Sequence, residues 1–304
     1  MTKSELIIIA SMLLVLLTNN SVGQGCSDAG FCTIDSFKPN DSDSSETFNN
    51  QIKIGAFFGS ADNKISVYGN YLEFKRKLNS VVGIDLKMTT LAQNGNGISV
   101  IGLSDIFVNA NYKATENLKI TFGSKIPVSK AGRSYEGLPL PMDYQASLGT
   151  FDLIIGVGYE IQKLKIVLAL QQPIIQNDNQ FFASSYPSGS SFTSFQSTNK
   201  FIRSGDLLLR VSYPFSLNPK LKLTLSALPI YHLANDKYTD ELNVEKEING
   251  SRGLTMNTNI YFDYEITKKN VIQVNFGAPF IVRESRPDGL TRSFIANLEY
   301  RIKF

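Results

Sequence analysis

The side chains that most often carry out chemistry are scarce in this chain of 304 residues, which has two cysteines and one histidine. Cys26 and Cys32 lie close together near the amino terminus, whereas His232 is far from both. A metal site would need more ligands, so in an oxidising compartment the two cysteines most simply form a disulfide. No spacing suggests a nucleophile with its base, and His232 fits an interfacial position where a strand leaves a membrane. We therefore expect neither an enzyme nor a metal or cofactor site.

A second group of candidates consists of polar side chains at alternate positions of otherwise apolar runs. Successive side chains of a strand point to opposite faces, so these polar residues share one face and the apolar residues share the other. The charged candidates for a polar interior are Asp105, Lys125, Asp152, Asp206, Arg210, Asp263 and Glu265. The same parity adds Lys53, Asp85, Lys87, Asn109, Asn111, Lys113, Lys119, Lys222, Asn257, Asn259, Gln273 and Asn275. Their mixed signs favour pairing within the interior, and simple packing is the plainest role for any one of them.

Elements of one kind are needed to position these residues. About twelve alternating or Val/Ile/Leu-rich runs follow one another, and no segment has a useful helical period. The expected strands are 50–59, 64–76, 80–91, 103–114, 117–127, 147–161, 163–174, 203–214, 219–232, 252–266, 269–282 and 290–304. The sequence therefore predicts an all-β fold with an even number of antiparallel strands.

The connections between these runs fall into two classes. Those after even-numbered runs are tight, whereas those after odd-numbered runs are mostly long. The long connections are Gln93–Gly102, Ser129–Gln145, Ile175–Ile202 and Asn235–Arg252. Transmembrane β-barrels with both termini in the periplasm have short inner turns and long outer loops, which a soluble sandwich has no reason to show. We expect an antiparallel transmembrane barrel over residues 49–304, in the outer membrane, with Ile175–Ile202 as its largest external loop.

The carboxyl terminus agrees with a barrel. Leu298, Tyr300, Ile302 and Phe304 alternate with charged residues, and this ending resembles the insertion signal of outer-membrane β-barrels. The resemblance implies two partners, the outer-membrane lipid and the machinery that assembles barrels.

The amino terminus is organised in two parts. Lys3 precedes an apolar run, Leu6–Leu17, and small residues stand before Gln24, so residues 1–23 are typical of an export signal; the run is short for a membrane anchor. Residues 24–48 hold the two cysteines and an acidic linker. They form either a segment that docks at or inside the barrel as a plug, or a flexible leader.

Composition excludes two further classes. The mean hydropathy of −0.07 excludes a helical membrane protein, although a barrel needs only every second residue apolar. The net charge of +3 comes without a clustered basic face, so nucleic-acid binding has no support.

Short motifs add a family resemblance. Gly102–Ile106, Ala110–Lys113, Ile120–Ser129 and Leu148–Asp152 resemble the pattern of outer-membrane barrels associated with meta-pathway phenol degradation, relatives of the FadL-type transporters of hydrophobic compounds. This resemblance implies passive uptake of small hydrophobic or aromatic molecules, with Asp105 and Asp152 as the matched charged positions. The alternative is a filled structural barrel, acting as a scaffold or as a subunit of a larger outer-membrane assembly.

Overall fold

The computed structural model describes residues 31–39, 48–289 and 293–304. The expected export signal and Cys26 lie outside these residues, so the Cys26–Cys32 disulfide stays a prediction. The twelve long strands are β1 (Asn50–Ser60), β2 (Ser66–Lys77), β3 (Val82–Gly95), β4 (Ile98–Lys113), β5 (Leu118–Ile126), β8 (Phe151–Ile161), β9 (Leu164–Ile175), β10 (Asp206–Ser216), β11 (Leu221–His232), β14 (Gly253–Thr267), β15 (Asn270–Ile281) and β16 (Phe294–Lys303).

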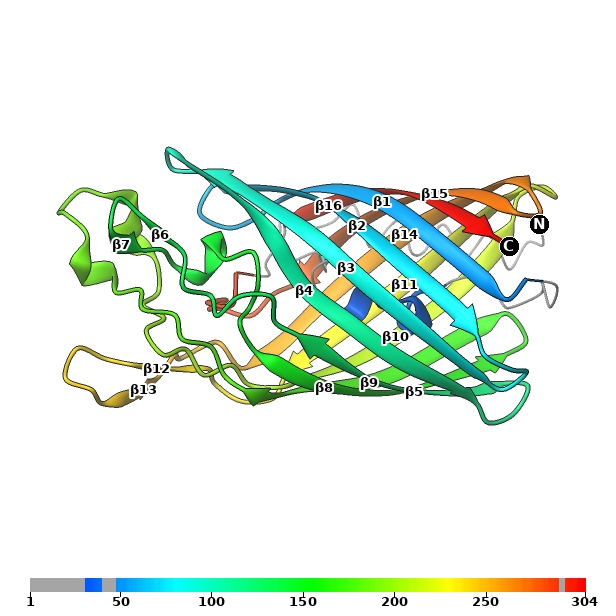
Figure 1. Ribbon diagram of the computed structural model, residues 1–304, viewed down its shortest axis with the longest axis horizontal. Helices are drawn as coiled ribbons and strands as arrows, with labels where there is room; N and C mark the ends of the chain where they lie inside the picture. The colour runs from blue at the N-terminus through cyan, green and yellow to red at the C-terminus, as the bar shows by residue number, and fades with distance from the viewer. Residues whose placement is uncertain (1–30, 40–47, 290–292) are drawn as a thin grey trace.

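These strands form one closed antiparallel barrel in the order β1-β16-β15-β14-β11-β10-β9-β8-β5-β4-β3-β2 (Figure 1). Each strand pairs with its neighbours in sequence, and the pairing of β1 with β16 closes the ring. At that seam Asn50 and Phe304 exchange two backbone hydrogen bonds of 2.9 Å. The prediction of a twelve-strand antiparallel barrel is confirmed. The start of β1 and the end of β16 lie side by side at the end of the barrel that carries the tight turns.

Strand alternation gives the barrel an apolar outside and a polar inside. Outward-facing exposed side chains, one from each strand, are Ile54, Leu72, Leu86, Val108, Phe122, Ile155, Leu168, Leu209, Tyr231, Phe262, Phe276 and Leu298. Inward-facing buried side chains, again one from each strand, are Lys53, Glu73, Lys87, Asn109, Lys125, Asp152, Gln171, Arg210, Ser226, Asn259, Gln273 and Glu299. This is the arrangement of a transmembrane β-barrel, whose outer surface faces lipid.

Two of the expected interior residues are not enclosed. Lys113 and Glu265 are exposed, and both lie at the strand ends beside the tight turns. The pairing of β14 with β15 shifts register between Glu265 and Thr267, so the regular inside–outside alternation ends there. Lys113 pairs regularly with Lys119, and Glu265 pairs with the buried residue Val271, so both keep the inward parity and are exposed because they stand at the open end of the barrel.

The long loops lie at the end opposite the carboxyl terminus, here called the outer end, and they form as expected with one exception (Figure 1). The long loops carry short elements of their own: β6 (Ser134–Tyr135), β7 (Leu138–Pro139), β12 (Lys237–Thr239) and β13 (Glu245–Glu247), with the 3-10 turns η3 (Met142–Tyr144), η4 (Ala183–Ser185) and η5 (Ser191–Ser194). Figure 1 shows them gathered at the outer end. Among the described residues, no helix is long and apolar enough to cross a membrane.

The exception is the connection between β3 and β4. A long loop over Gln93–Gly102 was wrong, because both strands continue to a two-residue turn at Asn96 and Gly97. Their φ values are 53° and 77°, and positive φ at both central residues is what the Asn-Gly hairpin turn requires. This hairpin therefore extends beyond the neighbouring β1–β2 connection at the same end of the barrel (Figure 1).

Candidate functional site

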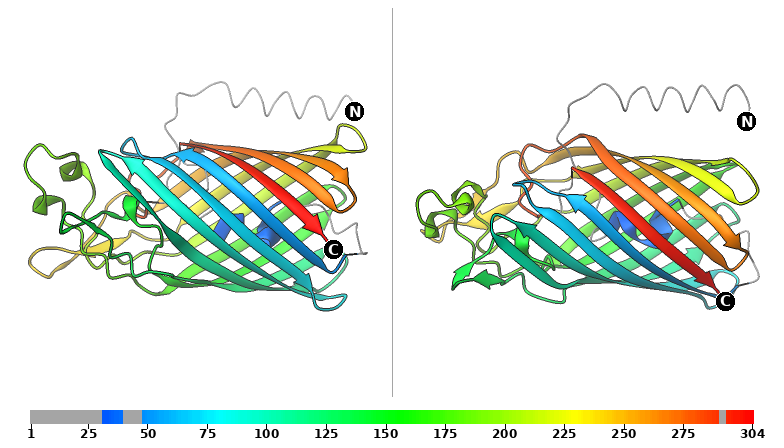
Figure 2. Two further views of the ribbon diagram at one scale, coloured as in Figure 1. Left: turned by 45° about the horizontal axis from the view of Figure 1, so that its top comes forward. Right: turned by 90° about the horizontal axis from the view of Figure 1, so that it is seen from above.

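The barrel interior is occupied by a short piece of the chain itself. Residues 31–39, here called the inner segment, form two 3-10 turns, η1 (Phe31–Thr33) and η2 (Asp35–Phe37), that lie within the ring of strands (Figures 1 and 2). Residues 32–39 are all buried. Their polar contacts reach seven strands, namely β1, β2, β3, β4, β9, β10 and β16. The inner segment thus crosses the passage that the barrel would otherwise enclose.

Ion pairs hold the acidic side of the inner segment. Asp35 pairs with Lys53 of β1 and, at 3.0 Å, with Lys75 of β2. Lys53 also lies 3.1 Å from Glu73 of β2, so one buried lysine bridges the segment and the wall. On β3, Lys87 donates a 2.8 Å hydrogen bond to the Thr33 hydroxyl. Buried charges are stable only when paired, so these contacts keep the segment and its wall mutually dependent.

The basic end of the segment is held from the other strands. Lys38 pairs with Glu299 of β16 at 3.3 Å. Arg210 of β10 donates to the Phe37 carbonyl at 2.6 Å, and Lys165 of β9 donates to the Lys38 carbonyl at 2.9 Å. Lys38 lies over the ring of Tyr71, with 5.1 Å between its ammonium nitrogen and the ring centroid. Cation–π contact adds to the ion pair and fixes the lysine against the wall.

Apolar packing completes the docking. Cys32, Ile34 and Phe37 join a buried cluster with wall residues that face inward from β4, β8, β9, β10 and β11: Phe107, Ile154, Val167, Ala169, Leu208 and Leu228. Phe37 fills the space over Gly156 of β8, where an added Cβ would stand 2.4 Å from its ring. Glycine at 156 therefore makes room for the aromatic ring of the segment.

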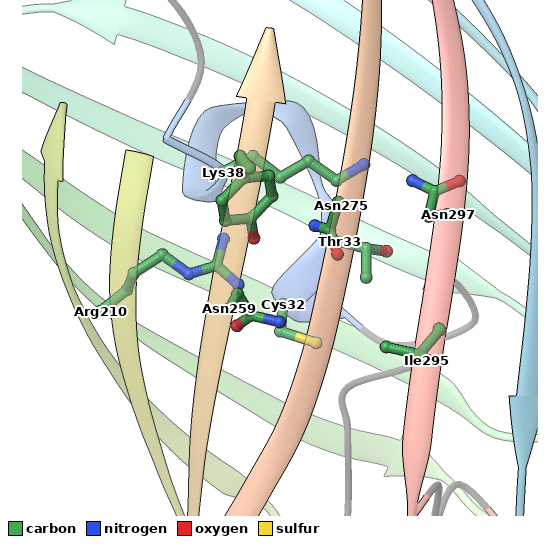
Figure 3. A pocket seen from close by; sticks show the side chains of 9 residues that line it. Cys32, Thr33, Lys38, Arg210, Asn259, Asn275, Ile295 and Asn297 are labelled. Atoms are coloured by element: carbon green, nitrogen blue, oxygen red, sulfur yellow. The ribbon is translucent and has the colours of Figure 1, made fainter. Parts of the chain in front are cut away.

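A cavity lies between the inner segment and the wall. It is lined by Cys32, Thr33, Lys38, Arg210, Asn259, Tyr261, Asn275, Ile295 and Asn297, and Figure 3 shows the segment residues facing side chains from β10, β14, β15 and β16. Its volume is about 10 Å³, roughly what one water molecule needs. A cavity of this size passes no organic molecule, so it does not bypass the segment.

The outer half of the interior has a different character. Inward-facing side chains at the outer ends of β1, β2, β3, β4 and β16 form an apolar wall of Phe57, Val67, Leu91, Ile98, Val100 and Ile295. Lumen-facing positions of water-filled barrels are usually polar. The outer ends of these five strands are therefore apolar on the inside, whereas the interior around the inner segment is largely polar.

Aromatic side chains of the outer loops pack onto the apolar wall. Tyr144 comes from the loop between β5 and β8, whereas Phe192 and Phe195 come from the loop between β9 and β10. The ring centroids of Tyr144 and Phe192 lie 5.6 Å apart, and those of Phe192 and Phe195 lie 5.3 Å apart. These three side chains are here called the aromatic lid. The Tyr144 hydroxyl donates a hydrogen bond to the Gly95 carbonyl at 2.9 Å, which attaches the lid to the β3–β4 hairpin.

Three charged residues expected in the interior lie together. Lys125 of β5 lies 3.4 Å from Asp105 and 3.2 Å from Asp152, and it donates to the Thr150 hydroxyl at 2.7 Å. Asp105 also accepts a 2.5 Å hydrogen bond from the Ser147 hydroxyl. Two carboxylates thus share one lysine at the base of the β5–β8 loop, which fixes the start of β8.

The remaining charged candidates lie in separate places. Arg210 binds the inner segment, as described, and Asp263 pairs with Arg301 at 3.1 Å. Asp206 lies at the outer end of β10 and pairs with Arg203 at 2.5 Å. At the carboxyl terminus, Leu298 and Phe304 are exposed on the outside, as an insertion signal facing lipid would require.

His232 is not an interfacial residue. It lies at the outer end of β11 as expected, but only 1% of it is exposed because its ring points inward. The Nδ1 atom lies 2.7 Å from Asp206 and the Nε2 atom lies 2.7 Å from Asp236. The buried residues Arg203, Asp206, His232, Asp236, Arg283 and Asp288 form one group, here called the rim cluster.

The rim cluster is strongly coupled. Burial alone would raise the pKa of the Asp288 carboxyl, but Arg283 at 3.0 Å and Arg203 at 3.3 Å outweigh burial and lower it to about 2. Burial would likewise lower the pKa of Arg203, yet Asp206, Asp288 and Asp236 raise it. Each charge is thus stabilised by its neighbours.

Several of these residues were not singled out from the sequence. Glu73, Lys75 and Tyr71 alternate along β2 and could have been found by the same parity rule. The apolar residues at lumen positions were a second signal, because Ile154, Val167 and Leu208 mark where an apolar partner docks inside. Asp206 and His232 of the rim cluster were named from the sequence, but their four partners, Arg203, Asp236, Arg283 and Asp288, come from three loops that are distant in sequence.

Comparisons with known proteins add likenesses of fold. No family model matches the chain, and no curated protein matches it. Solved structures that resemble it include the translocator domain of the autotransporter NalP from Neisseria meningitidis, at 10% identity and a TM-score of 0.48, covering 86% of this chain and 90% of that one.

Two further solved structures are also similar in fold. The toluene transporter TodX of Pseudomonas putida has 10% identity and a TM-score of 0.45, covering 93% of this chain and 96% of that one. A FadL homologue of Pseudomonas aeruginosa has 9% identity and a TM-score of 0.41, covering 94% and 96%. At these values the likenesses carry no inference about what this chain binds.

Proposed function

We propose that this chain is an outer-membrane channel for small hydrophobic or aromatic molecules, held closed by its own inner segment and outer loops. The observation that carries the proposal is the apolar wall at the outer ends of β1, β2, β3, β4 and β16, where Phe57, Val67, Leu91 and Val100 face inward. A concave, mostly apolar surface with aromatic side chains is the usual form of a binding place for apolar molecules. We also propose that the barrel lies in the outer membrane with both termini on the periplasmic side.

The inner segment supplies the closed state. It has to leave its position, or shift within it, before a molecule larger than water can pass the polar part of the interior. Its contacts suit a reversible block, because the Asp35 and Lys38 charges become solvated as the segment moves away. Residues Lys53 and Glu299 of the wall would then face an open, hydrated passage.

We propose that the barrel transports molecules and does not catalyse a reaction, because its one histidine is not placed to act as a base. Both ring nitrogens of His232 face carboxylates, so neither is available to activate a nucleophile. The rim cluster therefore has the features of a structural group.

A filled structural barrel remains the second candidate, and a specific observation favours it. The inner segment contacts seven strands, which is also what a permanent internal brace would do. In that case the apolar wall would serve only to seat the loops. The two candidates differ in whether apolar solutes enter faster through the protein.

The test compares two adjacent phenylalanines of β1. Phe57 faces the interior and is 4% exposed, whereas Phe58 faces outward and is 49% exposed. Uptake of labelled toluene by cells that carry the protein, normalised to the amount of folded barrel, should exceed that of cells without it. Phe57→Asn should reduce this excess several-fold, and the matched control Phe58→Asn should leave it unchanged. Equal uptake with and without the protein would favour the structural barrel.

A further inference from the structure

The rim cluster joins three outer loops at one point. Arg203 belongs to the loop after β9, Asp236 to the loop after β11, and Arg283 and Asp288 to the loop after β15. Arg283 donates to the Ser251 carbonyl at 2.8 Å, and the Asp236 carboxylate accepts from the Ser204 backbone at 2.8 Å. Backbone hydrogen bonds between Ile202 and Lys237, and from Ser285 to Gly250, also join these loops, so the rim cluster is the buried charged part of a wider contact between them.

His232 occupies the centre of this cluster. A carboxylate oxygen can only accept a hydrogen bond, so an imidazole placed between two carboxylates must donate through both ring nitrogens. Both distances are 2.7 Å, one to Asp206 and one to Asp236. An imidazole that donates twice carries two N–H groups and one positive charge.

The charges of the cluster support the same state. Three carboxylates, those of Asp206, Asp236 and Asp288, face two guanidinium groups, those of Arg203 and Arg283. A protonated His232 brings this buried group to neutrality, whereas a neutral ring leaves it with an unpaired negative charge. Leaving one charge of a buried group unpaired is strongly destabilising.

The other charged side chains near His232 pair with residues outside the rim cluster. Lys237 pairs with Glu245 at 2.7 Å, and Arg252 donates to the Tyr231 hydroxyl at 3.2 Å. The next acidic residue inward is Asp152, which binds Lys125 and adds to the field at Arg203. The protonation of His232 is therefore governed by the five charged partners of the rim cluster, together with this more distant carboxylate.

We propose that His232 is a protonation-dependent latch that holds the three loops together over the mouth of the barrel. While the ring is protonated, both aspartates bind it and the loops stay joined. As the pH rises and the ring loses its proton, one aspartate loses its hydrogen bond and the cluster gains a net negative charge. The latch then opens and the packing between the loops loosens, a change that requires no transport and stands apart from the proposed function.

A single tryptophan provides the test, because the natural chain has none. Phe201 is fully buried in one cluster with Ile248 of the loop after β11 and Met142 of the loop between β5 and β8. In folded Phe201→Trp protein, emission should indicate a buried ring at neutral pH. As the pH is raised above the ordinary imidazole range, emission should shift to the red and acrylamide quenching should rise several-fold, reversibly.

Second variants assign this change to the histidine. His232→Gln in the tryptophan protein should give the exposed emission at every pH, while heat-modified gel migration shows the barrel intact. Asp236→Asn removes one of the two carboxylates and should move the transition to lower pH. The control Lys237→Gln, one residue away and outside the cluster, should behave like the parent. A buried emission at all pH values in the His232→Gln protein would overturn the latch, as would an unmoved transition in Asp236→Asn.

Discussion

Single residues in this barrel act according to the face they occupy. Along β16, Leu298 is exposed on the outside, while Glu299 and Arg301 are buried and paired inside. The same side chain would therefore have opposite effects at adjacent positions. The outside tolerates apolar groups of almost any shape, whereas the inside depends on particular partners.

We expect Leu298→Arg to impair assembly. A charged residue near the middle of the lipid-facing surface costs about 2–4 kcal/mol, whereas Lys303→Gln, at the strand end, replaces one polar group with another. The folded fraction, measured as the heat-modifiable band after refolding into lipid, should fall for Leu298→Arg and stay near the parent for Lys303→Gln. Phe304→Ala should also lower assembly in cells. Equal loss in all three variants would contradict the assignment of faces.

We expect the rim cluster to come apart in acid as well, whereas the His232 latch opens as the pH rises. The pKa of Asp288 is lowered from 3.8 to about 2, so its stabilising contribution is complete above about pH 4 and is lost as the pH falls through about 2. In the Phe201→Trp protein, emission should stay buried down to about pH 4 and shift between about pH 4 and about pH 2. Asp288→Asn should open the rim already at neutral pH. Asp178→Asn, in an exposed pair with Lys130, is the matched control; a similar effect from it would point to general acid unfolding.

At the scale of elements, the inner segment and the wall fit each other sterically as well as electrostatically. Gly156 and Gly158 both face inward from β8, but only Gly156 lies under Phe37. At Gly158 the nearest atom to an added Cβ is a Val167 methyl at 3.7 Å, an ordinary contact. A substitution at Gly156 therefore tests the docking of Phe37, whereas the same substitution at Gly158 tests only the effect on β8 itself.

We expect Gly156→Ala to displace the inner segment. Its Cβ would stand 2.4 Å from the Phe37 ring, too close for any real contact, so the ring must move out. Protease cleavage of the folded protein within residues 31–39 should become several times faster, while Gly158→Ala should match the parent. Unchanged protection in Gly156→Ala would show that the segment is not held through Phe37.

The elements also show which parts of the structure sequence could predict. The twelve strands were predictable because a lipid-facing surface imposes strict alternation, as along Leu298, Tyr300 and Ile302. The β3–β4 hairpin was missed although Asn96-Gly97 is a strong turn signal, because glycine and polar residues around it suggested a loop. The docking of the inner segment was left open, since Asp35, Lys53 and Glu73 meet only once the barrel has closed.

For the whole molecule, the structure describes a barrel closed at two levels. The inner segment blocks the polar part of the interior, the aromatic lid covers the apolar wall, and the rim cluster joins the loops beside that lid. We expect an organic solute to need changes at both levels, whereas small ions need only the removal of the inner segment. A barrel that served only as a scaffold would need the first level alone.

The most direct measurement is the conductance of single barrels in a planar bilayer, with and without residues Gln24–Pro39. The parent should stay mostly closed because the segment occupies the passage. The deletion should give stable open steps, at least several-fold larger than any seen in the parent, because its absence leaves Lys53 and Glu299 facing a hydrated lumen. A folded deletion protein that conducts no better than the parent would contradict the account of a channel closed by its own inner segment.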